Sequence, residues 1–338
     1  MEQIIVSDNH MPRATVIENA VLAPIEPQAE DTSTSKPFIE ANTIASSLGE
    51  IRDNHIIPVF IKDNETLISH AEFIEITMDC VSSVYASERI LSPSIRLSHP
   101  VKGRIPSARE KPASQLQDHE KTLYYERMAF VIEIPSIQDT IDGHTLSLMV
   151  GGVKAYNLDN IYSRKGTDEH FKVFIGFQNK VCTNLCVWTD GLLGDLKVKT
   201  SSQLHAAIKA LFSSYNAPFH LYHMDQLSQY SLSEHQFAQL IGRCRLYPFL
   251  PKEQQNEIPP LMLGDSQIRS VAQDYYRDSS FCRSESGDIN LWRLYNLLTS
   301  ANRSTYIDSF VDRSVGAYHF TEQLKCAIAH KVNNWFLN

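Results

Sequence analysis

The chain has 338 residues, of which 43% are hydrophobic and 21% charged, and its formal net charge is −8 at pH 7. This length predicts two domains, or one large domain with a tail, and the overall negative charge does not favour nucleic acid except at local basic patches. Six cysteines are too few for a disulfide framework, and neither an apolar leader nor an apolar stretch of membrane-spanning length is visible, so we expect a cytoplasmic protein with reduced thiols.

Residues 1–54 have the composition of a tail. Four prolines interrupt this segment, at positions 12, 24, 27 and 37, and residues 28–36 are polar and rich in Ser and Thr. Such a stretch buries too little apolar surface to offset its ordering entropy. We therefore predict that residues 1–54 are disordered or weakly ordered.

An α+β core is expected over residues 55–199. His55–Lys62 reads as a short edge strand because it contains Pro58. Asn64 then has the character of a helix N-cap, and apolar residues recur at intervals of three and four from Leu67 to Tyr85. These features predict a long amphipathic helix over residues 64–86 that packs across a sheet.

The segment 89–127 is locally basic and contains prolines 93, 100, 106 and 112, which exclude a long helix. We expect a long irregular loop, and such loops in compact domains are usually functional or disordered. An ordinary solvated surface excursion is the alternative. Its candidate phosphate-binding residues are Arg96, His99, Lys102, Arg104, Arg109 and Lys111.

The sheet itself is predicted within residues 128–188. Its expected strands are Met128–Ile134, Thr145–Tyr156, Phe171–Phe177 and Val181–Trp188. Asp142-Gly143 is a hairpin dipeptide, and Gly151-Gly152 indicates a bulge or a close backbone approach. Connections this short predict an antiparallel sheet of about four strands. Residues 200–338 carry helical patterns and are expected to form a mainly helical region packed on this core.

Two groups could hold a metal ion. Asp190, Asp195 and Lys197 are similar to the D-x-K element of metal-dependent nucleases, although a charged strand end is the ordinary interpretation. Cys182 and Cys186 lack the second ligand pair that zinc sites need, and buried cysteines on a strand are commonly core residues. We therefore assign no metal, no cofactor and no catalytic residue, and no phosphate-loop, dinucleotide or hydrolase motif is present.

Two aromatic and basic clusters have the residue types that bind single-stranded nucleic acid, because bases stack on rings and guanidinium groups contact phosphates. The alternative is ordinary amphipathic packing. The residues are Tyr124, Tyr125, Arg127, Tyr275, Tyr276 and Arg277.

Several strings resemble an uncharacterised bacterial family, domain-of-unknown-function family three-eight-seven-one, which is found on conjugative and other mobile elements. The similarity runs from about Ile56 to Ala329 and rests on His55–Asn64, Arg96–Pro100, Gly151–Asn160, Val181–Gly191 and Tyr275–Asp278. A more distant similarity to the phage/plasmid-like protein family rests on Val181–Asn184 and Leu291–Asn296. The resemblance implies a role in DNA transfer, recombination or host defence, and it carries over no catalytic residue.

We expect a non-enzymatic nucleic-acid-binding accessory factor that contacts single- or double-stranded DNA through the basic loop Arg96–Lys111 and the tyrosine clusters. The first alternative is a metal-dependent nuclease built on Asp190, Asp195 and Lys197. The second is a protein-binding or anti-defence factor without an active site, a homo-oligomer that acts through its oligomer interface, which an extensive exposed apolar patch or a stable oligomer would favour.

Overall fold

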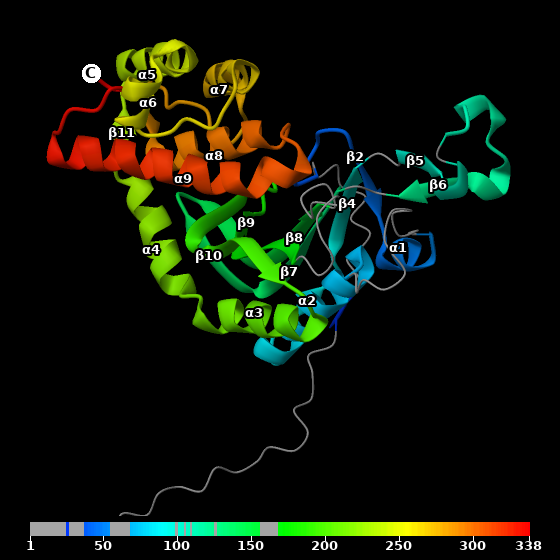
Figure 1. Cartoon of the computed structure of the whole chain (residues 1–338). Helices are drawn as coiled ribbons and strands as arrows, with labels where there is room; N and C mark the ends of the chain where they lie inside the picture. The colour runs from blue at the N-terminus through cyan, green and yellow to red at the C-terminus, as the bar shows by residue number, and fades with distance from the viewer. Residues whose placement is uncertain are drawn as a thin grey trace, which may run out of the picture.

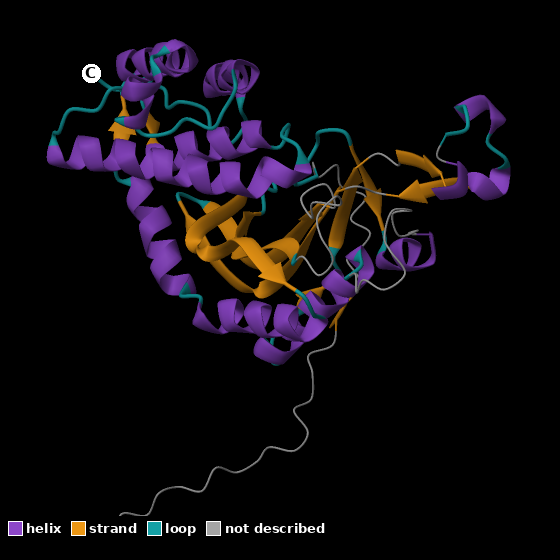
Figure 2. Cartoon of the chain, viewed as in Figure 1, coloured by secondary structure: helices purple, strands orange, loops and turns teal. Residues whose placement is uncertain are grey.

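The computed structural model describes residues 25–26, 37–54, 68–98, 101–104, 106–108, 110–124, 127–155 and 168–338. The fold is α+β, as predicted, with an antiparallel sheet enclosed by helices that belong mainly to the C-terminal half (Figures 1 and 2). The expected strand His55–Lys62 and the expected helix cap Asn64 lie outside the described residues.

The central sheet has six strands, and every neighbouring pair is antiparallel. In spatial order they are β10 (Leu185–Val198), β9 (Glu169–Asn179), β8 (His144–Ala155), β7 (Arg127–Ile141), β4 (Ser94–Ser98) and β2 (Thr43–Ser46). Strands β7 to β10 follow one another in the chain, which confirms the predicted sheet centred on residues 128–188.

Three two-stranded pairings accompany this sheet. They are β1 (Ile25–Glu26) with β3 (Ile90–Leu91), β5 (Val101–Arg104) with β6 (Lys121–Tyr124), and β11 (Ser231–Leu232) with β12 (Ile289–Asn290). Short 3-10 turns are η1 (Pro106–Ala108), η2 (Ala113–Gln115), η3 (Asp118–Glu120) and η5 (Tyr247–Phe249).

The described α-helices cover both sides of the sheet. They are α1 (Leu48–Asn54), α2 (His70–Val84), α3 (Ser201–Ser214), α4 (Ala217–Ser228), α5 (Glu234–Leu246), α6 (Lys252–Asn256), α7 (Asp265–Arg277), α8 (Leu291–Asn302) and α9 (Ile307–His330). Within the described ranges, none of these helices combines the length and apolarity that crossing a membrane requires.

Alternate residues of the same strands build the core on the two faces of the sheet. On β8, Leu148 and Val150 belong to the large core formed with α2, α3, α4 and α8. Met149 and Val153 face the other way and pack with Phe310 and its neighbours at the start of α9. Figure 1 shows this arrangement, with α9 on one side of the sheet and α2 and α3 on the other. The alternation predicted from the sequence therefore separates two core layers.

The two glycine signals of the sheet have different causes. Asp142 and Gly143 have φ angles of 49° and 78° and form the two-residue turn between β7 and β8, as predicted. At Gly152, a Cβ atom would lie 2.3 Å from the ring of Phe73 in α2. The strand pairing is regular at Gly151-Gly152, so the close approach is confirmed and the bulge is not found there.

The predicted bounds of one strand and one helix were wrong. The expected strand Val181–Trp188 begins only at Leu185, because residues 179–183 form a turn. It continues to Val198, because a shift in its register with β9 accommodates Asp190-Gly191 inside β10. Helix α2 begins at His70 because Ser69 and Glu72 form a reciprocal capping box.

Part of the predicted tail and of the predicted irregular loop belongs to the folded body. Strand β2 pairs with β4, and Ile51 of α1 is buried in the large core with 1% of its surface exposed. Residues 89–127 also contribute β3, β4, β5 and β6. Apolar residues spaced too widely to form an obvious pattern still fill the edge of the core.

A network of buried amide side chains fastens the helical half to the sheet. Asn179 and Asn184 bracket the β9–β10 turn, and they donate to the side-chain Oδ1 (3.2 Å) and the backbone carbonyl (2.8 Å) of Asn296 in α8. Asn296 donates in turn to the carbonyl of Trp292 at 2.9 Å. Each of the three asparagines has at most 1% of its surface exposed. Because buried amides are costly without partners, this network specifies how α8 sits on the turn.

A second buried polar group lies between α4 and the sheet. The imidazole of His220 packs among the rings of Phe177, Trp188 and Tyr318, with centroid separations of 5.8, 5.7 and 6.0 Å. Its Nδ1 atom is hydrogen-bonded with the hydroxyl of Tyr215. Burial lowers the pKa of His220 from 6.5 to about 3, and His223 contributes to the shift. His220 is therefore neutral in the folded protein.

We predict that Asn296→Ala destabilises the protein, because it removes the Oδ1 acceptor of the buried Asn179 amide and leaves that amide without its partner on α8. Each unsatisfied group costs about 1–3 kcal/mol. Urea unfolding should show this loss in the free energy of unfolding, whereas the exposed Gln229→Ala should change it little. An Asn296→Ala protein as stable as the wild type would contradict the assigned role.

His220 predicts a pH dependence of stability. Its folded pKa lies below its unfolded pKa, so the stability it contributes is present above pH 6.5 and is lost as the pH falls toward 3. Between pH 7 and pH 5 this loss amounts to about 2 kcal/mol. Unfolding measured at both values should show a smaller pH effect in His220→Gln than in the wild type. Equal pH effects would mean that His220 titrates normally when folded.

Candidate nucleic-acid interface

The β5–β6 hairpin, with the short 3-10 turns that connect its strands, projects from the body of the protein as an arm (Figure 1). Its strands pair antiparallel, with Lys102 opposite Leu123 and Arg104 opposite Lys121. Residues two apart on a strand, and residues directly opposite in register, share one face. Lys102, Arg104 and Lys121 therefore lie on the same face of the arm.

This placement of like charges is unfavourable by itself. Arg104 and Lys121 are directly opposite, and like charges at such positions destabilise a strand pair. The register thus places Lys121 and two of the basic residues that the sequence singled out, Lys102 and Arg104, on one face of the ribbon.

The connection between the two strands carries charges of both signs. Lys111 forms an ion pair with Glu120, which also accepts a hydrogen bond from the backbone N–H of Gln117 at 2.9 Å. These partners hold the pKa of the Glu120 carboxyl below its ordinary value. Lys111 is thus engaged within the arm, and the cationic face is confined to the paired strands.

Two other predicted phosphate ligands have structural roles. Arg96 on β4 donates to the hydroxyl of Thr43 at 3.0 Å and to its carbonyl at 2.8 Å, and burial lowers the pKa of its guanidinium. Arg127 on β7 forms an ion pair with Asp308 of α9, with an Nε to Oδ2 distance of 3.3 Å. These arginines fasten β2 and α9 to the sheet.

The tyrosine pair of α7 divides between core and surface. Tyr275 is fully buried, stacks on Phe237 with a centroid separation of 3.9 Å, and donates to the carbonyl of Gly287. Its ring is therefore inaccessible to a base. Tyr276 is 57% exposed and donates to Glu234 at 2.8 Å, and the adjacent Arg277 is exposed. Figure 1 shows α7 well separated from the arm, so the two predicted clusters do not form one surface.

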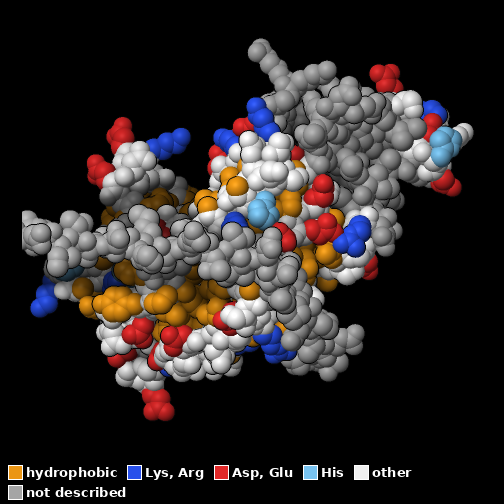
Figure 3. All heavy atoms as spheres, turned by 90° about the horizontal axis from the view of Figure 1, so that it is seen from below, with side chains coloured by type: hydrophobic (Ala, Val, Ile, Leu, Met, Phe, Trp, Pro, Cys, Tyr) orange, Lys and Arg blue, Asp and Glu red, His pale blue; other side chains and the backbone are white. Residues whose placement is uncertain are grey.

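The remaining residues of the predicted interface lie away from this face or outside the described part of the chain. Tyr124 ends β6 and lies opposite Val101, on the face of the ribbon away from the three cations. His99, Arg109 and Tyr125 lie outside the described residues. On the described part of the face seen in Figure 3, Lys and Arg are interspersed with Asp and Glu.

Two residues of the nuclease hypothesis, Asp195 and Lys197, form an ion-pair cluster with His170, and Asp190 lies apart from it. Asp195 contacts Lys197 (2.8 Å) and His170 (2.9 Å). Both partners lower the pKa of the Asp195 carboxyl, and Lys197 has the larger effect. Asp190 is exposed on the same strand, beyond the shift in register of β10. Within the described ranges, no three His, Cys, Asp or Glu side chains are grouped as a metal ion requires.

The two cysteines considered as metal ligands differ in environment. Cys186 is fully buried in the large core, and burial raises the pKa of its thiol. Cys182 is half-buried in the β9–β10 turn, where its carbonyl accepts a hydrogen bond from Arg303 at 2.6 Å. All six cysteines are free thiols. The surroundings of this pair are those of packing and turn residues.

A buried ion pair escaped the sequence analysis. Lys154 has no exposed surface, and its Nζ atom lies 2.6 Å from Glu169 Oε2 and 4.0 Å from the centre of the Phe171 ring. Glu169 also accepts the backbone N–H of Ile68, just before α2, at 2.9 Å. Lys154 falls on the same face of the strand as Leu146, Leu148 and Val150. This alternation in the sequence indicates that its side chain faces the core.

Comparison with known proteins gives one match. A family model described as "Domain of unknown function, B. Theta Gene description (DUF3871)" matches residues 16–337. No curated protein and no solved structure matches the chain.

We predict that Arg96→Ser loosens the edge strand β2, because the guanidinium of Arg96 holds both the hydroxyl and the carbonyl of Thr43. Hydrogen exchange followed by mass spectrometry should show faster exchange in residues 43–46, with exchange in β8 unchanged. The exposed Arg277→Ser is the matched control. Unchanged exchange in residues 43–46 would show that strand pairing alone holds β2.

Proposed function

The chain belongs to the family of unknown function DUF3871. We propose that it is a non-enzymatic nucleic-acid-binding factor whose contact surface is the β5–β6 arm. One observation carries the proposal: the register of the arm puts Lys102, Arg104 and Lys121 on a single face. The phosphate backbone of DNA supplies the negative charge that such a face lacks.

The shape of the arm supports the same conclusion. A two-stranded ribbon fits the major groove of DNA, and several DNA-binding proteins use strands in this way. The arm projects from the body, so the acidic remainder of the protein need not approach the nucleic acid closely. Contacts of this kind are mainly to phosphates, so we propose binding that depends weakly on base sequence.

The biological setting is part of the proposal. The similarity to proteins of conjugative and other mobile elements supports an accessory role in DNA transfer or recombination, in the cytoplasm, on single- or double-stranded DNA. A homo-oligomer would place several arms on one DNA molecule and would raise the affinity through multivalency.

We predict that changing Lys102, Arg104 and Lys121 together to Ser weakens DNA binding and reduces its salt dependence. Each phosphate contact contributes about 0.9 to the slope of log K against log salt concentration on duplex DNA. Fluorescence anisotropy with labelled single- and double-stranded DNA, over a salt series, should therefore show a slope shallower by about 2.7 on the duplex.

The matched control changes three exposed cations elsewhere, Lys252, Arg269 and Lys331, to Ser, which alters the net charge equally. This variant should keep the wild-type slope. Equal losses in both variants would indicate a general charge effect, and absence of binding by the wild type at low salt would refute the proposed function.

A further inference from the structure

A groove lies between α4 and the end of β7, and Figure 1 places α4 on the opposite side of the molecule from the β5–β6 arm. The groove has a volume of about 330 Å³ and is lined by residues 139–141 of β7 and by Pro218, Leu221, Tyr222 and Asp225 of α4. It is thus an apolar groove with a carboxylate on each wall.

The groove runs along the edge of a strand. Successive side chains of a strand point to opposite faces of the sheet, so a groove over one face would be lined by every second residue. Three consecutive residues of β7 line this groove, so it lies beside the edge of the strand. This part of β7 pairs with β8, where Asp139 lies opposite Leu146. Strand β4 pairs only with residues 128–131 of β7, and no other described strand pairs with residues 138–141. An extended segment can therefore lie beside this edge.

One exposed aromatic side chain lies on the helix side of the groove. Tyr222 is 59% exposed. Tyrosine and other large aromatic residues supply much of the binding energy of protein interfaces.

The charge of the groove selects the chemistry of its occupant. Asp139 and Asp225 are both exposed at its walls. Asp142, at the same end of β7, is instead neutralised by Arg293, with an Nε to Oδ2 distance of 3.1 Å. Exposed carboxylates on both sides of an apolar groove favour a ligand with positive charges flanking an apolar group and disfavour nucleic acid.

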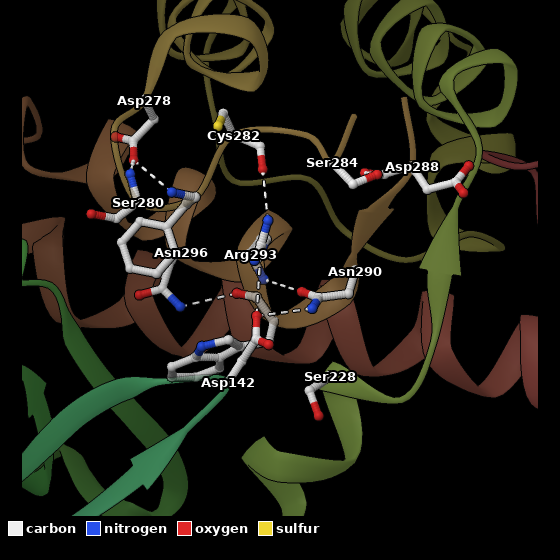
Figure 4. Close-up of polar contacts among 12 residues, drawn as sticks. Asp142, Ser228, Asp278, Ser280, Cys282, Ser284, Asp288, Asn290, Arg293 and Asn296 are labelled. Atoms are coloured by element: carbon white, nitrogen blue, oxygen red, sulfur yellow. Dashed lines mark hydrogen bonds and ion pairs between the residues drawn. The ribbon is translucent and has the colours of Figure 1, made fainter. Parts of the chain in front are cut away.

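The β-strand wall is held in place before any ligand arrives. Asp142 at the hairpin tip also accepts a hydrogen bond from Asn290 at 3.0 Å, and Arg293 donates to the carbonyl of Cys282 at 3.2 Å (Figure 4). Asn290 caps α8, so the hairpin tip is fixed to the start of that helix. A fixed wall lowers the ordering cost of binding.

We propose that this groove binds an extended, cationic segment of a partner protein. An apolar side chain of the segment would pack against Pro218, Leu221 and Tyr222, and flanking Lys or Arg side chains would pair with Asp139 and Asp225. The proposal is independent of nucleic-acid binding by the arm, because it involves a different surface with the opposite charge.

The test uses the full chain and a fluorescein-labelled peptide of alternating arginine and leucine, followed by fluorescence anisotropy. The wild type should bind it, and Asp139→Asn combined with Asp225→Asn should weaken binding about tenfold. Tyr222→Ser should weaken it at least as much. Glu253→Gln combined with Glu285→Gln removes the same charge from exposed sites elsewhere and should leave the affinity unchanged.

Peptides of alternating glutamate and leucine, or of arginine and serine, should bind much more weakly than the arginine–leucine peptide. Equal binding by either peptide, equal affinity of all the variants, or no binding by the wild type would overturn the proposal. A dimer detected by light scattering and lost in Tyr222→Ser would also overturn it, because a second copy of the chain would then occupy the groove.

Discussion

The amide of Asn296 makes the contact on which the joining of the two halves depends. Its Oδ1 accepts a hydrogen bond from Asn179 at one end of the β9–β10 turn, and the backbone carbonyl of the same residue accepts one from Asn184 at the other end, within a core that excludes water. Apolar packing is non-directional and would allow α8 to shift along the sheet, whereas buried amides need partners at defined positions. The position of α8 then fixes Arg293, and Arg293 holds the tip of the β7–β8 hairpin beside α4.

Charge is distributed unevenly over this framework. Within the body, three cations form ion pairs with specific partners: Lys154 with Glu169, Lys172 with Asp312 and Arg127 with Asp308. On the β5–β6 arm the register instead collects like charges on one face. At the α4 groove the exposed charges are carboxylates. A protein with net charge −8 thus has three basic residues on one face of the arm and two exposed carboxylates at a groove on the opposite side of the molecule.

The sequence predicted the elements whose signal is local. The alternation of Leu146, Leu148 and Val150 and the turn dipeptide Asp142-Gly143 depend on neighbouring residues, and both predictions are confirmed. Strand β2 and the amide network could not be found in this way, because pairing of Thr43–Ser46 with β4 and the approach of Asn296 to Asn179 join residues far apart in the chain. The same holds for the candidate site. The sequence identified the basic residues, but only the structure shows that Lys102 and Arg104 lie on one face of the arm, whereas Arg96 binds Thr43 and stabilises the fold.

Hydrogen exchange with and without DNA tests nucleic-acid binding by the arm most directly. A short duplex and a single strand would each be added to the full chain at low salt, and exchange would be followed by mass spectrometry. We expect slower exchange confined to residues 101–104 and 121–124, with no change at α4. Bound DNA that leaves these two strands unprotected, or that protects another surface instead, would contradict it.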